Sequence, residues 1–521
     1  MRRGAIAPFV ALSSFVLLAG SLQGAHPVLA AGDGVDIQAV DDFLRGEMSA
    51  LHIPGLAVAI VQGQQIVQMR GFGVADSTGR AVTAQTPFVL ASTTKELTAL
   101  AVMQLVEAGK LELDSPVRSY IPWFATADFD LSGRITVREL LNMTSGLSTL
   151  SGRLDEAGSD SGRGALERAV RRLSSQPLAS APGREFHYSN SDYVVLGMLV
   201  QAVSAEPYGV YMQSHVFMPL DMGHTHSDAS EAMQDGLAEG SYPWFGFIPV
   251  ATRYPFSAQV PAEGIISSAE DMAHVLVMNL NDGSYGSQTL ISPAGLELIH
   301  TGVADEGGGY RYAMGWAVHP LYGDPAPDLA ANRFTLPLVL DHTGDAANYH
   351  SVIALLPGLK RGAVLLMNSN DEISGAGYFR LQVGIEQILA RMPVYPADYF
   401  SDNPLRQFGR QIYFALLAIE SLWIALWVWT MRRGHRSDNR KLIRIRPAAT
   451  VLGLFLFISA VGFLWFVLPG MFDITATVLI RLFPDVATVG IALTALTAAW
   501  TALRATLVAR SILQRIRRSQ T

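Results

Sequence analysis

Ser92-Thr93-Thr94-Lys95 begins the stretch that decides the fold, and ELTALAVMQLV follows at positions 96–106. The residues after the lysine are mostly apolar and include neither proline nor glycine, so we expect a largely buried helix closed by Gly109. The chain has only four lysines, and a buried helix rarely tolerates one at its start. Lys95 is therefore expected to have a chemical role.

The spacing of Ser92 and Lys95 indicates what that role is. Residues three apart lie on one face of a helix, so the Lys95 amine can point at the Ser92 hydroxyl. Apolar surroundings disfavour the charged form of an amine, and a neutral amine can act as a base. A serine hydroxyl needs such a neighbour to become a nucleophile, and the N–H groups at the helix start would face an oxyanion formed there.

Composition limits the classes of protein to consider. The chain has 521 residues, half of them hydrophobic, and a positive mean hydropathy, which suggests a soluble domain joined to membrane segments. It has no cysteine, which excludes disulfides, thiolate catalysis and cysteine-bound metals. Residues 1–400 carry a net charge of −17, which argues against a nucleic-acid partner because phosphate would be repelled.

The N-terminus predicts export. Arg2 and Arg3 precede an apolar run from Ala5 to Ala19, and the small residues up to Ala30 suit signal-peptidase cleavage. We therefore expect a signal peptide over residues 1–30. An uncleaved anchor is the alternative, and either reading places the following domain outside the cytoplasm.

The C-terminus predicts membrane anchoring. Three apolar segments, 412–431, 448–468 and 486–503, are each long enough to cross a bilayer as a helix, and a linker over 393–411 leads to them. Basic residues crowd the loop between the first two segments and the tail at 504–521. By the positive-inside rule the loop and the tail are cytoplasmic and the large domain lies outside. The lipid bilayer is thus an expected partner.

The large domain, residues 33–392, has strands near both of its ends. Residues 55–61 and 65–73 read as paired strands after a helix at 37–51. Residues 351–356 and 363–368 form a second predicted hairpin, followed by a helix at about 378–391. With mostly helical sequence between them, these elements predict one antiparallel sheet with an inserted helical region.

Two further groups of residues complete a predicted site. Tyr188-Ser189-Asn190 places a phenol and an amide in a loop that enters an apolar helix. His342-Thr343-Gly344-Asp345 follows a predicted strand at 338–340, and its glycine would let a substrate backbone approach the strand edge closely.

Together and in this order, the motifs Ser-x-x-Lys, Tyr-x-Asn and His-x-Gly resemble those of the penicillin-recognising serine hydrolases, in their class C β-lactamase and D-peptidase branch. Segments around the motifs, at 135–147, 261–272 and 314–316, are also similar to sequences of this family. The resemblance covers about residues 35–390. It implies an α/β (α+β) fold of the β-lactamase/transpeptidase type. The antiparallel sheet would be flanked by helices and joined to an all-helical subdomain, with a three-helix transmembrane region following.

The resemblance also implies a role for each matching residue. Ser92 would be the acylated nucleophile and Lys95 its partner in proton transfer, while Tyr188 would protonate the leaving group and later activate water. Either Lys95 or Tyr188 could take the first proton. Asn190 would orient the substrate carbonyl or amide, and the backbone N–H groups of Ser92 and Asp345 would form the oxyanion hole.

One departure from the family pattern concerns the substrate. β-Lactamases of this branch have a lysine at the position of His342, and a histidine, whose ordinary pKa is about 6.5, is mostly neutral at pH 7. His342, Gly344 and Asp345 are therefore expected to bind a peptide or ester rather than a β-lactam carboxylate. No cofactor or metal is predicted: His224-Thr225-His226-Ser227-Asp228 resembles the start of a binuclear zinc signature, but Ala229 occupies the place of its next histidine.

The sequence thus predicts a serine hydrolase tethered to a bacterial inner (cytoplasmic) membrane, with its catalytic domain on the periplasmic or extracellular side. Its substrate would be a small molecule or peptide, with D-amino-acid peptides included. Three alternatives stay open: a prodrug-maturing D-asparagine peptidase, a β-lactamase or penicillin-binding protein, and a non-catalytic binding or sensing module. The sequence indicates no particular protein partner.

Overall fold

The computed structural model describes residues 34–151, 160–244, 248–251, 258–321, 336–371 and 376–396, with scattered positions between 418 and 517. The predicted signal peptide, most of the predicted linker, most of the first two predicted membrane segments and most of the predicted tail lie outside the described residues, whereas most of the third segment, 486–503, falls within them. Within the described residues, no helix combines the length and the apolar character needed to span a membrane.

An eight-stranded antiparallel sheet with strand order β2-β1-β14-β13-β12-β11-β10-β9 forms the centre of the domain. Its first and last strands in the chain are neighbours, since β1 pairs with β14 and Leu56 lies opposite Met367. Both predicted hairpins are therefore confirmed as parts of one sheet. The strands are β1 (Gly55–Gln62), β2 (Gln65–Gly73), β9 (Ala304–Gly307), β10 (Tyr310–Tyr312), β11 (Ala317–Pro320), β12 (Leu338–Ala346), β13 (Tyr349–Leu356) and β14 (Arg361–Met367).

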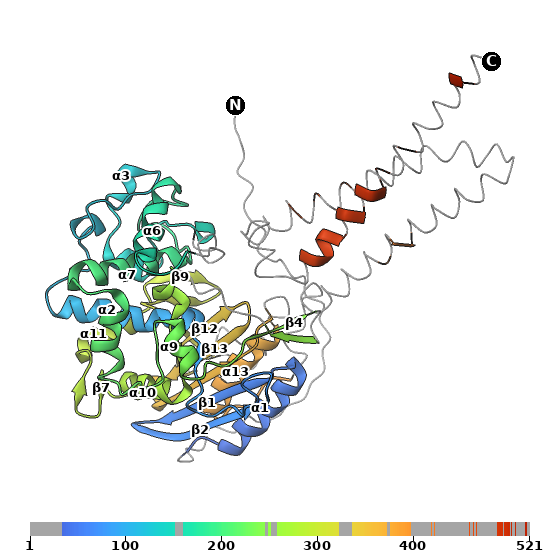
Figure 1. Ribbon diagram of the computed structural model, residues 1–521. Coiled ribbons are helices and arrows are strands. Elements are labelled where there is room, and N and C mark those ends of the chain that lie inside the picture. The colour runs from blue at the N-terminus through green and yellow to red at the C-terminus, as the bar shows by residue number, and fades with distance from the viewer. Residues whose placement is uncertain are drawn as a thin grey trace, which may run out of the picture. The chain divides into compact units, whose positions relative to one another are not determined.

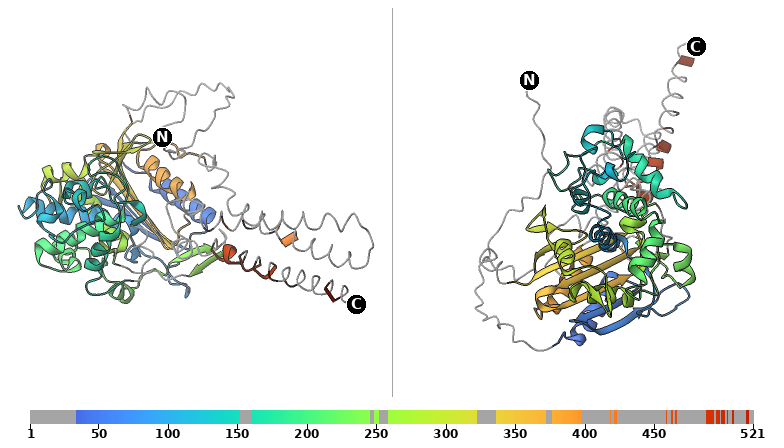
Figure 2. Two further views of the ribbon diagram at one scale, coloured as in Figure 1. Left: turned by 90° about the horizontal axis from the view of Figure 1, so that it is seen from above. Right: turned by 90° about the vertical axis from the view of Figure 1, so that its left-hand side faces the viewer.

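Two hydrophobic cores form because the central strands are apolar on both faces. On β1, Leu56 and Val58 belong to one core and Ala57 and Ala59 to the other, as the alternation of side chains along a strand requires. The first core is covered by α1 (Ile37–Leu51) and α13 (Ala376–Leu389), which lie side by side on one face of the sheet (Figures 1 and 2). The two predicted helices at the ends of the domain are thus confirmed.

The other face of the sheet carries the predicted insertion between β2 and β9, which is mainly helical (Figure 1). Three two-stranded sheets interrupt it, so it is not all-helical as expected: β3 (Phe88–Val89) with β6 (Ile266–Ser267), β4 (Ser241–Trp244) with β5 (Ile248–Ala251), and β7 (Ser284–Tyr285) with β8 (Gln288–Thr289). The β3–β6 pair has a structural reason, because it joins the segment before Ser92 to the segment after Gly264. The helices are α2 (Thr94–Glu107), α3 (Phe129–Ser132), α4 (Val137–Leu141), α6 (Ala165–Arg172), α7 (Asn190–Ser204), α8 (Tyr208–Met212), α9 (Ala229–Gln234), α10 (Ala269–Leu280) and α11 (Pro293–His300).

Candidate active site

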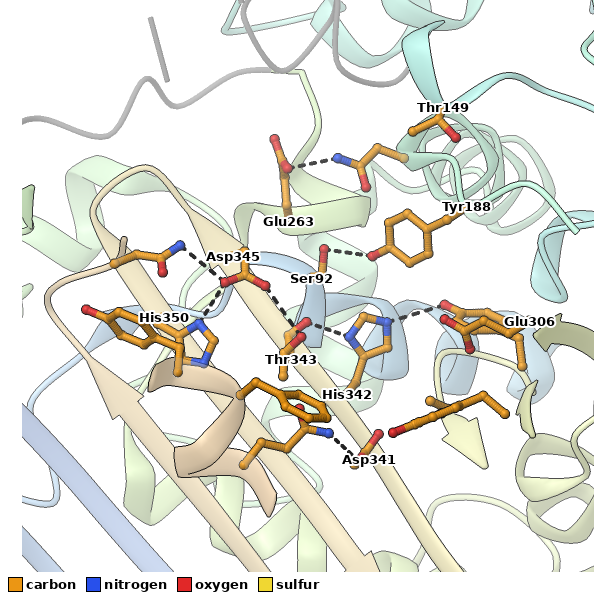
Figure 3. Close-up of a pocket in the computed structure, with 18 of the residues that line it drawn as sticks. Ser92, Thr149, Tyr188, Glu263, Glu306, Asp341, His342, Thr343, Asp345 and His350 are labelled. Carbon is orange, nitrogen blue, oxygen red and sulfur yellow. Dashed lines mark hydrogen bonds and ion pairs between the residues drawn. The ribbon is translucent and has the colours of Figure 1, made fainter. Parts of the chain in front are cut away.

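Ser92 lies in a 3-10 turn, Ala91–Thr93, that leads directly into α2. Ala91 has a φ of 49°, a left-handed backbone conformation that is uncommon for a residue with a Cβ. The turn is held from both sides, because Leu90 N donates to Ile265 O at 2.9 Å and Thr93 Oγ1 donates to Leu90 O at 2.9 Å. The Ser92 side chain is left half-buried at the wall of a cavity (Figure 3).

Lys95 is fully buried and its amine faces the serine, as its spacing predicted. Its Nζ lies 2.8 Å from Ser92 Oγ and donates to Ala262 O at 2.9 Å. Ala262 belongs to a short π-helical turn, Val260–Gly264, which also accepts a hydrogen bond from Thr98 of α2 through Pro261 O. This turn holds the Lys95 amine in place. The segment at 261–272, which resembles sequences of the family, therefore has a structural role.

Tyr188 completes a three-residue arrangement around the hydroxyl of Ser92. The Tyr188 hydroxyl donates to Ser92 Oγ at 2.8 Å, and Lys95 Nζ lies 4.9 Å from the centre of the phenol ring. Burial raises the pKa of Tyr188, so the phenol is protonated at neutral pH. Ser92 Oγ therefore lies between an amine and a phenol.

Asn190 is the first residue of α7 and lines the same cavity. Its Nδ2 donates to Glu263 Oε2 at 2.9 Å, a pairing that the sequence did not predict although Glu263 lies in the segment at 261–272. Its Oδ1 is buried and has no hydrogen-bond partner among the described residues. That oxygen is an open acceptor for an N–H group of a ligand.

The His-x-Gly motif lies inside β12 rather than after a strand. The predicted strand at 338–340 is only the start of β12, which continues through the motif to Ala346. A Cβ added to Gly344 would lie 2.0 Å from Leu90 O, 2.2 Å from Ser351 Oγ and 3.1 Å from Ser92 N. The close approach that this glycine permits is therefore between β12 and the nucleophile turn of the same chain, not only between the strand and a substrate.

His342 is buried beneath Tyr188 and is uncharged at neutral pH. Its Nδ1 lies 2.6 Å from Thr343 O and therefore carries a proton, while Nε2 lies 3.5 Å from the hydroxyl of Tyr312. Burial lowers the pKa of His342 to about 4. Tyr312, which the sequence did not single out, also packs edge-on against Tyr188, with ring centres 6.2 Å apart.

The cavity has a volume of about 700 Å³ and brings the predicted residues together (Figure 3). Of the seven predicted site residues, five line it, whereas Lys95 lies behind Ser92 and Gly344 packs against the nucleophile turn. The sequence did not single out several other lining residues, namely Thr149, Glu306, Tyr310, Asp341, His350 and Asn370.

One group within the described ranges has the spacing of metal ligands: His319, Asp341 and Glu386, whose ligand atoms lie within 4.8 Å of one another. Burial opposes the charge of His319, but the hydrogen bond to Asp341, at 2.9 Å from Nε2, and the charge of Asp341, together with smaller contributions, raise its pKa. Burial raises the pKa of Glu386 well above its ordinary value. Asp341 is thus already hydrogen-bonded to His319 within the cluster.

His224, His226 and Asp228, which resemble the start of a zinc signature, make hydrogen bonds within the protein instead. His224 Nδ1 and His226 Nε2 both lie beside Asp235 Oδ2, at 3.0 Å and 2.8 Å. Asp228 instead caps α9, where its carboxylate accepts from the backbone N–H groups of residues 230 and 231. The three members of the motif therefore do not converge on one point.

Known proteins share this arrangement of strands and helices. A penicillin-binding protein homologue from Pyrococcus abyssi, solved as an octamer, has a TM-score of 0.57 at 23% identity and covers 72% of this chain and 81% of its own. The D-alanine carboxypeptidase AmpC from Burkholderia cenocepacia has a TM-score of 0.54 at 23% identity, over 68% of this chain and 98% of its own. These similarities concern the fold.

The sequence comparisons define the family. The protein flp from Staphylococcus aureus strain MW2 is 28% identical over 337 residues, and this chain spans 64% of its length. Penicillin-binding protein 4 from Amycolatopsis lactamdurans is 27% identical over 339 residues, which are 63% of this chain and 83% of that protein. The sequence profile described as beta-lactamase matches residues 40–382. On this match, which covers more than half of the sequence, the chain belongs to the beta-lactamase family.

Proposed function

We propose that this protein is a serine acyl hydrolase that cleaves an amide or an ester through a covalent acyl-enzyme on Ser92. The observation that carries the proposal is the position of Ser92 Oγ, 2.8 Å from both Lys95 Nζ and the Tyr188 hydroxyl. A hydroxyl held between an amine and a phenol has one neighbour to accept its proton and another to donate one.

We assign the first proton transfer to Lys95 and the protonation of the leaving group to Tyr188. Ser92 Oγ attacks the substrate carbonyl carbon, and its proton passes to the neutral amine of Lys95. Because burial raises the pKa of Tyr188, the phenol keeps its proton until the C–N or C–O bond breaks and then donates it to the leaving group. Lys95 returns its proton to Tyr188, and the same pair then takes a proton from the water that attacks the acyl group and gives a proton to Ser92 Oγ as the ester bond breaks.

The oxyanion hole is assigned to the backbone N–H groups of Ser92 and Asp345. Support comes from the packing of Gly344, next to Asp345, against the backbone of Leu90 and Ser92. Each such donor contributes about 2.7–4 kcal/mol to stabilisation of the transition state in comparable sites.

We infer that the substrate is a peptide or ester rather than a β-lactam. The reason is that His342, in the place of the family lysine, has a pKa lowered to about 4 by burial and offers no positive charge to a β-lactam carboxylate at neutral pH. The D-alanine carboxypeptidase among the structural neighbours is consistent with a peptide that contains D-amino acids.

Labelling with a fluorescent fluorophosphonate tests the proposal directly. We expect the wild type and the exposed-serine control Ser174→Ala to be labelled, and Ser92→Ala to remain unlabelled. Equal labelling of Ser92→Ala, or no labelling of the wild type, would favour a non-catalytic binding module. Turnover of nitrocefin, p-nitrophenyl esters and D-amino-acid peptides, with acyl-D-asparaginyl peptides included, would then rank the candidate substrates.

We also propose that the domain is tethered to the outer face of a bacterial inner membrane. The support is the pattern of apolar segments and basic loops beyond residue 411. Protease added to intact spheroplasts should digest the large domain and leave the basic tail protected. Protection of the large domain would refute this topology.

A further inference from the structure

The cavity beside Ser92 has an acidic wall. Five carboxyl groups line it, and none of the described lining residues is a lysine or an arginine; the five are Glu263, Glu306, Asp341, Asp345 and Asp371. In Figure 3, Glu263, Glu306 and Asp345 lie on different sides of Ser92. Burial raises the pKa of Glu306 to about 7, so this group is only partly charged at neutral pH. The other carboxyl groups would still repel a carboxylate ligand and attract a cation.

The cations closest in sequence to the site have other partners. Lys95 Nζ is hydrogen-bonded to Ser92 and to Ala262 O. Arg311, between the lining residues Tyr310 and Tyr312, instead donates to the backbone oxygens of residues 302 and 303, both at 2.8 Å. Arg380, next to the lining residue Phe379, is paired with Glu47. None of these three side chains is therefore placed to receive a substrate carboxylate.

The side chain of Asp345 is held in place through one carboxylate oxygen, while the other oxygen is open to a ligand. Its Oδ1 accepts from His350 Nδ1 at 2.8 Å and from Asn370 Nδ2 at 3.2 Å, while Oδ2 is approached only by Thr343 Oγ1, at 3.4 Å. Its side chain is 43% exposed. By contrast, Asp341 is already paired with His319 and Glu263 with Asn190.

The Asp345 carboxyl also keeps its negative charge. Burial works to raise its pKa, but His350 and Asn370 outweigh that effect, so the pKa lies below its ordinary value. His350 Nδ1 and Asn370 Nδ2 both contact Oδ1, so they orient the carboxylate and leave Oδ2 open to a ligand donor.

A second observation points to a ligand that donates N–H groups. Asn190 Oδ1 lines the same cavity, its residue is only 8% exposed, and the oxygen has no hydrogen-bond partner in the described part of the chain. A buried acceptor without a partner is costly until a donor reaches it. An ammonium group and an amide N–H of one substrate would satisfy the open carboxylate and the open amide oxygen together.

We propose that the site takes substrates that carry a positive charge, specifically a primary ammonium group, and that Asp345 is the carboxylate that pairs with it. This inference rests on the proposed hydrolase function. It assigns Asp345 a side-chain role in specificity, separate from the oxyanion role of its backbone N–H.

Three phenyl esters of nearly equal size test the inference with the full-length protein. They are the phenyl ester of D-alanine, which is cationic, phenyl 2-methylpropanoate, which is neutral, and phenyl hydrogen methylmalonate, which is anionic. We expect kcat/KM, measured from released phenol, to be about tenfold higher for the cationic ester than for the neutral one, as a charge-assisted hydrogen bond would give. The anionic ester should be the slowest.

Two variants identify the group responsible. Asp345→Asn keeps the acceptor for His350 and Asn370 but removes the charge, so the ratio of kcat/KM between the cationic and neutral esters should fall to near unity. Asp42→Asn, an exposed position on α1, removes the same charge away from the cavity and should leave the ratio unchanged. A wild-type preference for the neutral or anionic ester, or an unchanged ratio in Asp345→Asn, would overturn the inference. No hydrolysis of any ester would instead refute the proposed function.

Discussion

Replacement of Gly344 by alanine would test how tightly β12 must pack against the nucleophile turn. The added Cβ would lie 2.0 Å from Leu90 O, and a Cβ atom essentially never approaches another heavy atom closer than 3.0 Å. The strand and the turn must therefore separate by about 1 Å. Ser351 Oγ, at 2.2 Å from the same Cβ, adds a second clash and blocks a simple sideways shift of the strand.

The separation should affect turnover more than folding. A misplacement of about 1 Å in a catalytic arrangement can lower the rate by about 100-fold, whereas overpacking destabilises by about 1–3 kcal/mol. We therefore expect Gly344→Ala to lose at least about 100-fold in kcat toward a p-nitrophenyl ester while it still unfolds cooperatively in urea.

The matched control is Gly46→Ala in α1, where a Cβ meets nothing within 4 Å. It should keep full activity and gain about 0.5–1 kcal/mol of stability, since alanine is the better residue inside a helix. Wild-type turnover by Gly344→Ala would show that the contact between β12 and the turn does not position the reacting groups. An unfolded variant would show that the packing serves the fold first.

Three further predictions concern the proton path, the buried imidazole and metals. Lys95→Ala and Tyr188→Phe should each lower kcat by at least about 100-fold, measured by stopped-flow ester hydrolysis, because each removes one partner in proton transfer; wild-type rates in either would contradict the path. His342 is neutral when folded and regains a pKa of about 6.5 on unfolding, so the free energy of unfolding should fall by about 3 kcal/mol as the pH drops from 6.5 to 4. His342→Asn should flatten that slope in urea titrations, and an unaltered slope would disprove the assignment. EDTA should leave turnover unchanged, whereas a loss that zinc restores would implicate a metal.

The sequence predicted the elements whose local pattern is strong. The bounds of α1 match the prediction, and β1 and β2 were found because apolar runs flank a glycine turn at Gly63. Strands β9 to β11 were not predicted, because they are only three or four residues long and β9 has just one buried position, Ala304. Pairing with one another, and through β11 with the long strand β12, rather than their own residues, makes these segments strands.

The sequence predicted the site residues whose side chains form a recognisable motif. It did not predict contacts that backbone atoms make or that join residues far apart in the sequence. Ser92, Lys95 and Tyr188 do converge, as the motifs implied. The carbonyl of Ala262 that holds the lysine has no side-chain signal, and the pairing of Asn190 with Glu263 joins positions 73 residues apart. Neither contact can be inferred from local sequence.

The adjacency of β1 and β14 has a consequence for biosynthesis. During synthesis, Ser92 and Lys95 are made early. The strand that packs against the nucleophile turn, β12, and the partner of β1, β14, are added only near the end of the domain. Closing the sheet brings together segments some 300 residues apart, which slows folding relative to local contacts. We therefore expect the proposed hydrolase activity to arise only when nearly the whole domain has been synthesised, and truncation before β14 should yield an inert product.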